Sequence, residues 1–165
     1  MESFVFIKEN DFVKARESIR KNFGKKIIFA SDDDELNRKI LEKLGKDSLS
    51  TSSRIGQSKE KINILLINQS GRKDSMKQRN SGFNHVLARI AKKNEVEIGI
   101  NLDEILNSGK AKKSDLLARV MQNVKLCSKN KLNMKFVSFE NKRDTYDLKS
   151  LGLVLGMPTW MVKGL

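Results

Sequence analysis

The sequence contains few of the residues from which disulfide frameworks and metal centres are built. Among its 165 residues there is one cysteine, Cys127, and one histidine, His85. A lone cysteine excludes an internal disulfide framework and is typical of a reducing cytosol. A single histidine cannot supply the several imidazole ligands of a multi-metal catalytic cluster.

The sequence also lacks the segments that direct a chain to a membrane. No apolar stretch approaches the roughly 18 residues that a spanning helix requires. The first residues, Met1-Glu2-Ser3-Phe4, lack the basic and apolar regions of a signal peptide. With 38% hydrophobic and 32% charged residues, the composition is that of a globular protein. We therefore expect a cytoplasmic protein with no membrane partner.

Acidic residues are scarce relative to basic ones. There are 33 lysines and arginines against 20 acidic residues, a net charge of +13. Residues 1–47 hold 11 basic and 10 acidic side chains, and residues 48–165 hold 22 and 10. A regional excess of positive charge attracts polyanions such as RNA. The alternative is a lysine-rich composition that serves only solubility.

Short β-type runs alternate with amphipathic helical patterns along the chain. The predicted strands cover residues 4–7, 27–30, 62–67, 96–100 and 134–139. The predicted helices cover residues 12–23, 35–44, 82–93, 114–130 and 147–155, with Asp11 and one of Asp32, Asp33 or Asp34 as the first two caps. The serine-rich stretch 46–61 interrupts this alternation, as a flexible insertion or as a weak strand with loops.

This alternation predicts an α/β fold with a mainly parallel sheet, in one domain over residues 1–165. The pattern does not distinguish an open sheet from a barrel. A complete eightfold barrel typically needs about 250 residues. We therefore expect at most a compact or incomplete barrel.

The segment 69–93, which follows the most apolar strand, is strongly basic. It holds one acidic residue, Asp74, against seven basic residues: Arg72, Lys73, Lys77, Arg79, Arg89, Lys92 and Lys93. With Ser81 as the cap of a helix over 82–93, Phe83, Val86, Leu87 and Ile90 would face the sheet. His85, Arg89, Lys92 and Lys93 would lie on the opposite face. A basic loop before a helix N-terminus, at the carboxyl edge of a parallel sheet, suits phosphate binding. The alternative is an ordinary solvated helix face.

Residues 79–94 read RNSGFNHVLARIAKKN, and VEIGI follows at 96–100. This stretch resembles the signature of ribonuclease P protein component 3, an archaeal and eukaryotic family. Residues 118–127 and 147–157 resemble the family's later helices, so that the resemblance covers roughly residues 60–160. The loop after the strand that ends at Ser138 is shorter than in the family. Residues 1–60 match the family poorly.

The resemblance implies a TIM-barrel-like fold related to polymerase-and-histidinol-phosphatase barrels. It implies a non-catalytic subunit of ribonuclease P that binds and stabilises the catalytic RNA, which removes 5′ leaders from precursor tRNA. The implied partners are that RNA, ribonuclease P protein component 2, other ribonuclease P proteins and, indirectly, precursor tRNA. It adds Arg143, before the last helix, to the RNA-contact candidates. No cofactor is expected on this chain, and magnesium is expected to serve the RNA catalyst.

Two other functions remain open from the sequence: a generic basic RNA-binding protein, and a metal-dependent phosphoesterase of the related barrel fold. Against a metal site, His85 lies in basic surroundings, and the acidic run 32–35 suits a helix start. Cys127 lies on an apolar helix face and is expected in the core. The segment around Trp160 either closes the core or offers a partner surface.

Overall fold

The computed structural model describes residues 4–22, 24–44, 62–77 and 79–165. The stretch 46–61, predicted to be a flexible insertion or a weak strand with loops, lies entirely in the gap between the second and third ranges. Its prediction therefore falls outside the described residues.

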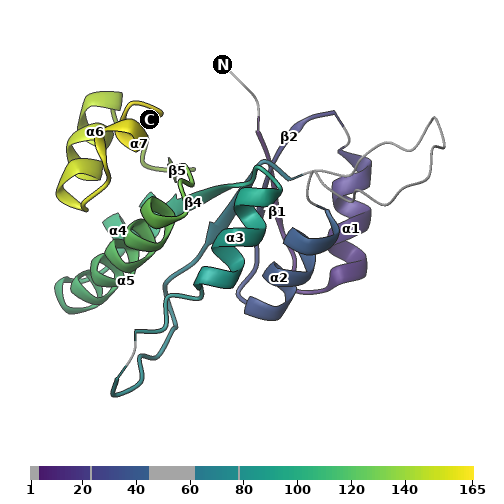
Figure 1. Ribbon diagram of the computed structural model, residues 1–165, viewed down its shortest axis with the longest axis horizontal. Helices are drawn as coiled ribbons and strands as arrows, with labels where there is room; N and C mark the ends of the chain where they lie inside the picture. Colours follow the sequence, from purple (N-terminus) through teal and green to yellow (C-terminus); the bar gives the residue numbers. More distant parts are fainter. Residues whose placement is uncertain (1–3, 23, 45–61, 78) are drawn as a thin grey trace.

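Five parallel strands form one sheet, with each strand beside the next in chain order (Figure 1). The strands are β1 (Phe4–Lys8), β2 (Lys26–Ala30), β3 (Ile64–Ile67), β4 (Glu97–Asn101) and β5 (Met134–Val137). Sequential parallel order with right-handed crossovers places the connecting helices on one face of the sheet. This confirms the predicted α/β fold with a parallel sheet.

Seven helices connect or follow these strands in the described part of the chain. They are α1 (Phe12–Lys21), α2 (Asp34–Lys43), α3 (His85–Lys93), α4 (Leu102–Asn107), α5 (Lys110–Lys129), α6 (Thr145–Val154) and α7 (Thr159–Val162). Asp11 and Asp33 cap α1 and α2 as expected, because each carboxylate accepts two backbone N–H groups of the first turn. The short helix α4 follows β4 directly and was not predicted.

Alternation along the strands divides the core into two layers. The outer face of the sheet packs against the helices through side chains that include Ile27, Phe29, Leu65, Ile98 and Met134. The inner face carries a smaller apolar cluster: Ile28, Ala30, Ile64, Leu66 and Val137. Because β3 is buried on both faces, it reads as a continuous apolar run.

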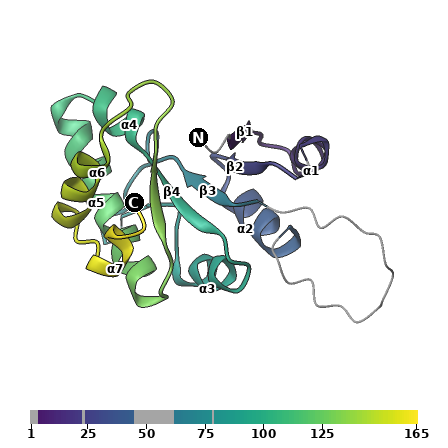
Figure 2. The same cartoon turned by 90° about the horizontal axis from the view of Figure 1, so that it is seen from above.

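The sheet curls, so that its first strand approaches the loop that follows its last strand (Figure 2). The rings of Phe6 on β1 and Phe139 after β5 lie 4.6 Å apart between centroids. On the concave face, a Cβ added to Gly99 would lie 2.9 Å from Leu66 Cδ1, so that only glycine permits this close packing. The five described strands thus form a barrel-like sheet that β1 and β5 do not close by pairing.

Helix α3 differs from the prediction in its start and in its buried face. It begins at His85, and Asn84 is the cap, since its Oδ1 accepts from Leu87 N–H at 2.9 Å. Ser81 is buried in the turn before the helix and donates to the carbonyl of Phe83. The later start leaves Leu87, Ala88 and Ala91 against the core, while Val86 is 40% exposed. The expectation that Val86 faces the sheet was wrong.

None of the helices in the described ranges is both long enough and apolar enough to cross a bilayer.

Truncation of Val86 and Leu87, two neighbouring residues on α3, tests which of the two side chains packs against the core. Leu87→Ala should lower the free energy of unfolding by about 2–5 kcal/mol, because it leaves a cavity in the core. Val86→Ala should change it by no more than about 0.5 kcal/mol, since the side chain is at the surface. Chemical denaturation followed by circular dichroism measures both. Equal losses in the two variants would contradict the observed helix orientation.

Candidate nucleic-acid interface

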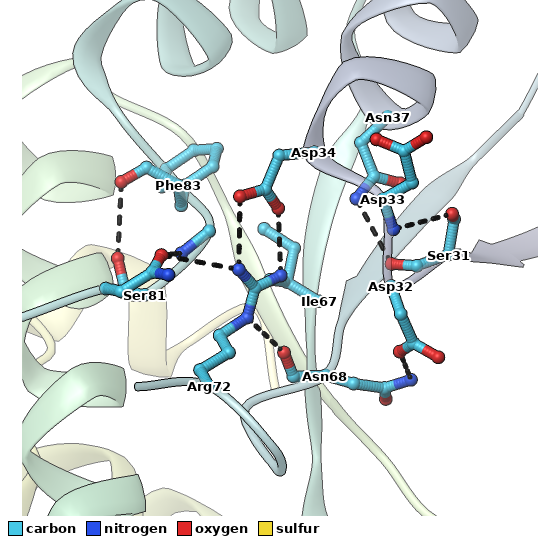
Figure 3. Close-up of polar contacts among 12 residues, drawn as sticks. Ser31, Asp32, Asp33, Asp34, Asn37, Ile67, Asn68, Arg72, Ser81 and Phe83 are labelled. Atoms are coloured by element: carbon cyan, nitrogen blue, oxygen red, sulfur yellow. Dashed lines mark hydrogen bonds and ion pairs between the residues drawn. The ribbon is translucent and has the colours of Figure 1, made fainter. Parts of the chain in front are cut away.

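The basic loop between β3 and α3, residues 68–84, is held on one side by Arg72. The Arg72 Nε donates to the carbonyl of Asn68 at 2.8 Å. Its two terminal nitrogens donate to the Asp34 carboxylate, at 3.1 and 2.9 Å (Figure 3). Its side chain is only 9% exposed. Arg72 therefore joins the loop to the first turn of α2, and its predicted contact with RNA phosphates stays an untested prediction for a side chain that is already paired with Asp34.

Arg119 of α5 holds the same loop from the other side. Its side chain is 7% exposed, and its Nε donates to Asp74 Oδ1 at 2.9 Å. Its remaining nitrogens donate to the carbonyls of Gln69 and Arg72, each at 2.9 Å. The hydrogen bond from Arg119, with a second from Asn80 N–H, lowers the pKa of Asp74. Sequence analysis missed Arg119, because nothing in its helical position distinguishes a buried guanidinium from a surface one.

Gly82 allows the Arg72 guanidinium to pack beneath the turn before α3. Its φ is +65°, a conformation that side-chain-bearing residues rarely adopt. A Cβ at this position would meet the guanidinium carbon at 2.2 Å. The glycine is therefore required both by its backbone and by the space that Arg72 occupies.

Arg72 and the unpredicted Arg119 point inward. The other predicted cations lie at the surface. The exposed members are Lys73, Lys77, Arg79, His85, Arg89, Lys92 and Lys93, and we call them the basic face. Lys92 also donates to the carbonyl of Lys131 at 2.7 Å. Arg143 is exposed too, but it lies on the separate loop between β5 and α6. The structure thus places eight of the nine predicted residues on this loop and helix, and seven of them, all except Arg72, are exposed there.

A hollow of about 610 Å³ opens beside the basic face, between the first turns of α2 and α3 and the side of α5. Lys73 and Arg79 line it, together with the loop residues around Gly82. Arg38 of α2 and Gln122 of α5 line it as well, and neither was predicted. Both lie far from residues 69–93 in sequence, so that only the packing of three helices brings them there.

The centre of the carboxyl edge of the sheet is acidic, in contrast to the basic face. Asp103 of α4 accepts hydrogen bonds from the N–H groups of Phe139 and Asn141 and from the Ser138 hydroxyl. Its neighbour Glu104 accepts from the N–H groups of the loop that follows β3. Carboxylates of the protein thus occupy the backbone donors that an anion would use there. The basic face lies on the flank of this edge, on the loop and α3.

Burial alone would raise the pKa of Asp103, which is 9% exposed. The hydrogen bonds from Phe139, Asn141 and Ser138 outweigh that effect and hold its pKa at about 2. The charged carboxylate is therefore the form that the folded loop stabilises.

The remaining candidates from the sequence are Cys127, a metal site and the segment around Trp160. Cys127 is fully buried, and burial raises the pKa of its thiol to about 12, so that its assignment to the core is confirmed. In the described ranges, no three or more histidine, cysteine or acidic side chains are grouped so that they could hold a metal ion. Met161 and Val162 are buried and close the core, whereas Trp160 is 37% exposed.

Asp103→Asn tests the carboxylate that holds the loop after β5. Because the folded pKa is below the unfolded value, wild-type stability from this group is present above pH ~4 and is lost as the pH falls toward 2. Near pH 6 the variant should be less stable by about 1–3 kcal/mol, since donors lose a charged acceptor. That difference should shrink in denaturation curves as the pH falls from 5 to 2. A difference that is constant with pH would contradict the assignment.

No family model matches the sequence. The structure is similar to a chain of the cryo-EM structure of archaeal ribonuclease P with mature tRNA, with a TM-score of 0.74 and 25% sequence identity. The similarity covers 98% of this chain and 63% of that chain, so that this chain spans less than two thirds of its neighbour's length. The likeness supports a ribonuclease P protein and does not by itself specify which subunit.

Proposed function

We propose that this chain is a non-catalytic protein subunit of ribonuclease P, of the component 3 type, that binds and stabilises the catalytic RNA. The observation that carries the proposal is the basic face, built on a loop that two buried arginines hold in place. The structural neighbour from archaeal ribonuclease P and the resemblance over residues 79–100 support it independently.

The rigid loop explains how the basic face would recognise folded RNA. Lysines and arginines on a disordered loop lose conformational freedom when they bind, which lowers affinity. Here Arg72 and Arg119 have already ordered the backbone that carries Lys73, Lys77 and Arg79. The cations of α3 extend this positively charged surface along the helix. Such a surface neutralises phosphates where RNA strands lie close together, without contributing to bond cleavage.

In this proposal the chemistry belongs to the RNA. Magnesium ions serve the RNA catalyst, and this chain holds no cofactor of its own. Component 2 and the other ribonuclease P proteins are its protein partners, and precursor tRNA is bound indirectly, within a cytoplasmic particle. The acidic centre of the carboxyl edge, at Asp103 and Glu104, separates the RNA-binding flank from the concave face of the sheet.

A generic basic RNA-binding protein is the second candidate, because the basic face alone carries no sequence specificity. The two functions differ in the RNA that they prefer. A ribonuclease P subunit should bind ribonuclease P RNA more tightly than a ribosomal RNA fragment of equal length. A generic binder should show no preference in the same competition experiment.

Replacement of three exposed lysines tests the basic face. Lys73, Lys77 and Lys93 changed together to alanine should weaken binding to ribonuclease P RNA. The slope of log affinity against log salt should become shallower by about 2 to 3, because three phosphate contacts release fewer counterions. Filter binding across a salt series measures both quantities.

The matched control replaces three exposed lysines on or beside α1, namely Lys14, Lys21 and Lys25. Both triple variants lose the same charge, and α2 separates α1 from α3 (Figure 1). The control should keep close to the wild-type slope. Identical affinities and slopes for the two variants would show that the basic face is only a solvated surface.

A further inference from the structure

Val86 is an apolar side chain at the surface of an otherwise cationic helix. It is 40% exposed and lies between His85 and the buried Leu87, where a basic face serving phosphates alone would carry a polar residue. Its side of α3 forms part of the wall of the hollow, together with Phe83 and Leu87. The hollow therefore has an apolar wall within a basic surface.

Other residues that line the hollow are polar. Asn80 and Asn84 use their Oδ1 atoms internally, to accept from Gly82 N–H at 3.3 Å and from Leu87 N–H at 2.9 Å. Among the described residues no acceptor faces their amide NH₂ groups, which are therefore available as donors. The half-buried amide of Gln122 contributes a donor and an acceptor from α5. Apolar and amide groups together suit a planar heterocycle with hydrogen-bonding edges.

The charges at the mouth of the hollow suit an anionic group. The carboxylate of Asp34 is paired with Arg72, and that of Glu35 lies 3.8 Å from Lys39. Lys73 and Arg79 therefore set the sign of the potential there. The first turn of α3 adds a positive helix end, because the first N–H groups of a helix lack intrahelical partners and the Asn84 side chain accepts that of Leu87.

We propose that this hollow takes one unpaired nucleotide of the bound RNA, with its base against Val86 and its phosphate near Arg79. The volume of about 610 Å³ lies in the range of small-molecule sites, roughly 300–1,000 Å³. It is too small for a double helix, whereas an unstacked base with its ribose and phosphate fits. The inference rests on the proposed function and adds that the basic face reads a single-stranded position.

A single reactive thiol tests this site, because the native Cys127 is fully buried. Val86→Cys introduces a thiol at the wall of the hollow, and Val13→Cys, at a 64% exposed position on α1, is the matched control. Each variant is alkylated with a maleimide in the presence of a 12-nucleotide unpaired RNA or a 12-base-pair RNA duplex. Fluorescence anisotropy first establishes that each RNA is bound to saturation.

The unpaired RNA should slow alkylation of the Val86→Cys variant roughly tenfold, as stable occupancy by a stacked base requires. The duplex should leave its rate nearly unchanged, and neither RNA should protect the Val13→Cys variant. In addition, Gln122→Ala should weaken binding of the unpaired RNA roughly two- to tenfold and that of the duplex not at all.

Saturating binding without protection, or equal protection by both RNAs, would overturn this inference and leave the proposed function intact. Failure of the unpaired RNA alone to bind would also overturn only this inference, whereas failure of both RNAs to bind would overturn the proposed function as well.

Discussion

The opposed hydrogen bonds of Arg72 and Arg119 hold the loop on which the basic face, the proposed RNA-binding surface, depends. One guanidinium reaches from the loop to Asp34 on α2, and the other reaches from α5 to Asp74 and two carbonyls of the loop. Both guanidinium groups are almost fully buried, whereas their partners Asp34 and Asp74 are 47% and 26% exposed. Removal of either carboxylate would therefore leave a buried positive charge without its counter-ion. Together the two arginines convert a 17-residue connection into a surface of fixed shape.

This arrangement also explains the division of charge at the carboxyl edge of the sheet. Parallel α/β folds usually bind ligands at this edge, where loops offer backbone N–H groups. In this chain the carboxylates of Asp103 and Glu104 accept hydrogen bonds from those N–H groups. They thereby fix the loops after β5 and β3. The exposed cations of the basic face lie on the flank of this edge, on the loop and α3. The proposed RNA-binding surface is therefore beside the usual ligand site of a parallel sheet and not at its centre.

Residues with local signals were predicted well, and residues with distant partners were not. The caps Asp11 and Asp33, the five strands and the core position of Cys127 follow from patterns within a few residues. Arg72 was assigned to the surface because its partner, Asp34, is 38 residues away in the chain. Val86 was assigned to the core because it has helical spacing with Ile90, whereas the buried face of α3 is centred on Leu87, Ala88 and Ala91, and the two alanines gave only a weak apolar signal. The hollow could not be predicted, since it requires side chains from α2, α3 and α5 together.

The central claim is that the basic face binds the RNA of ribonuclease P. Sequencing of the RNA that copurifies with the tagged protein from its native cells tests this claim most directly. The account predicts strong enrichment of ribonuclease P RNA with the wild-type chain, and its loss when Lys73, Lys77 and Lys93 are replaced by alanine. Enrichment of ribosomal RNA instead, or the same ribonuclease P RNA recovery from the triple variant, would contradict it.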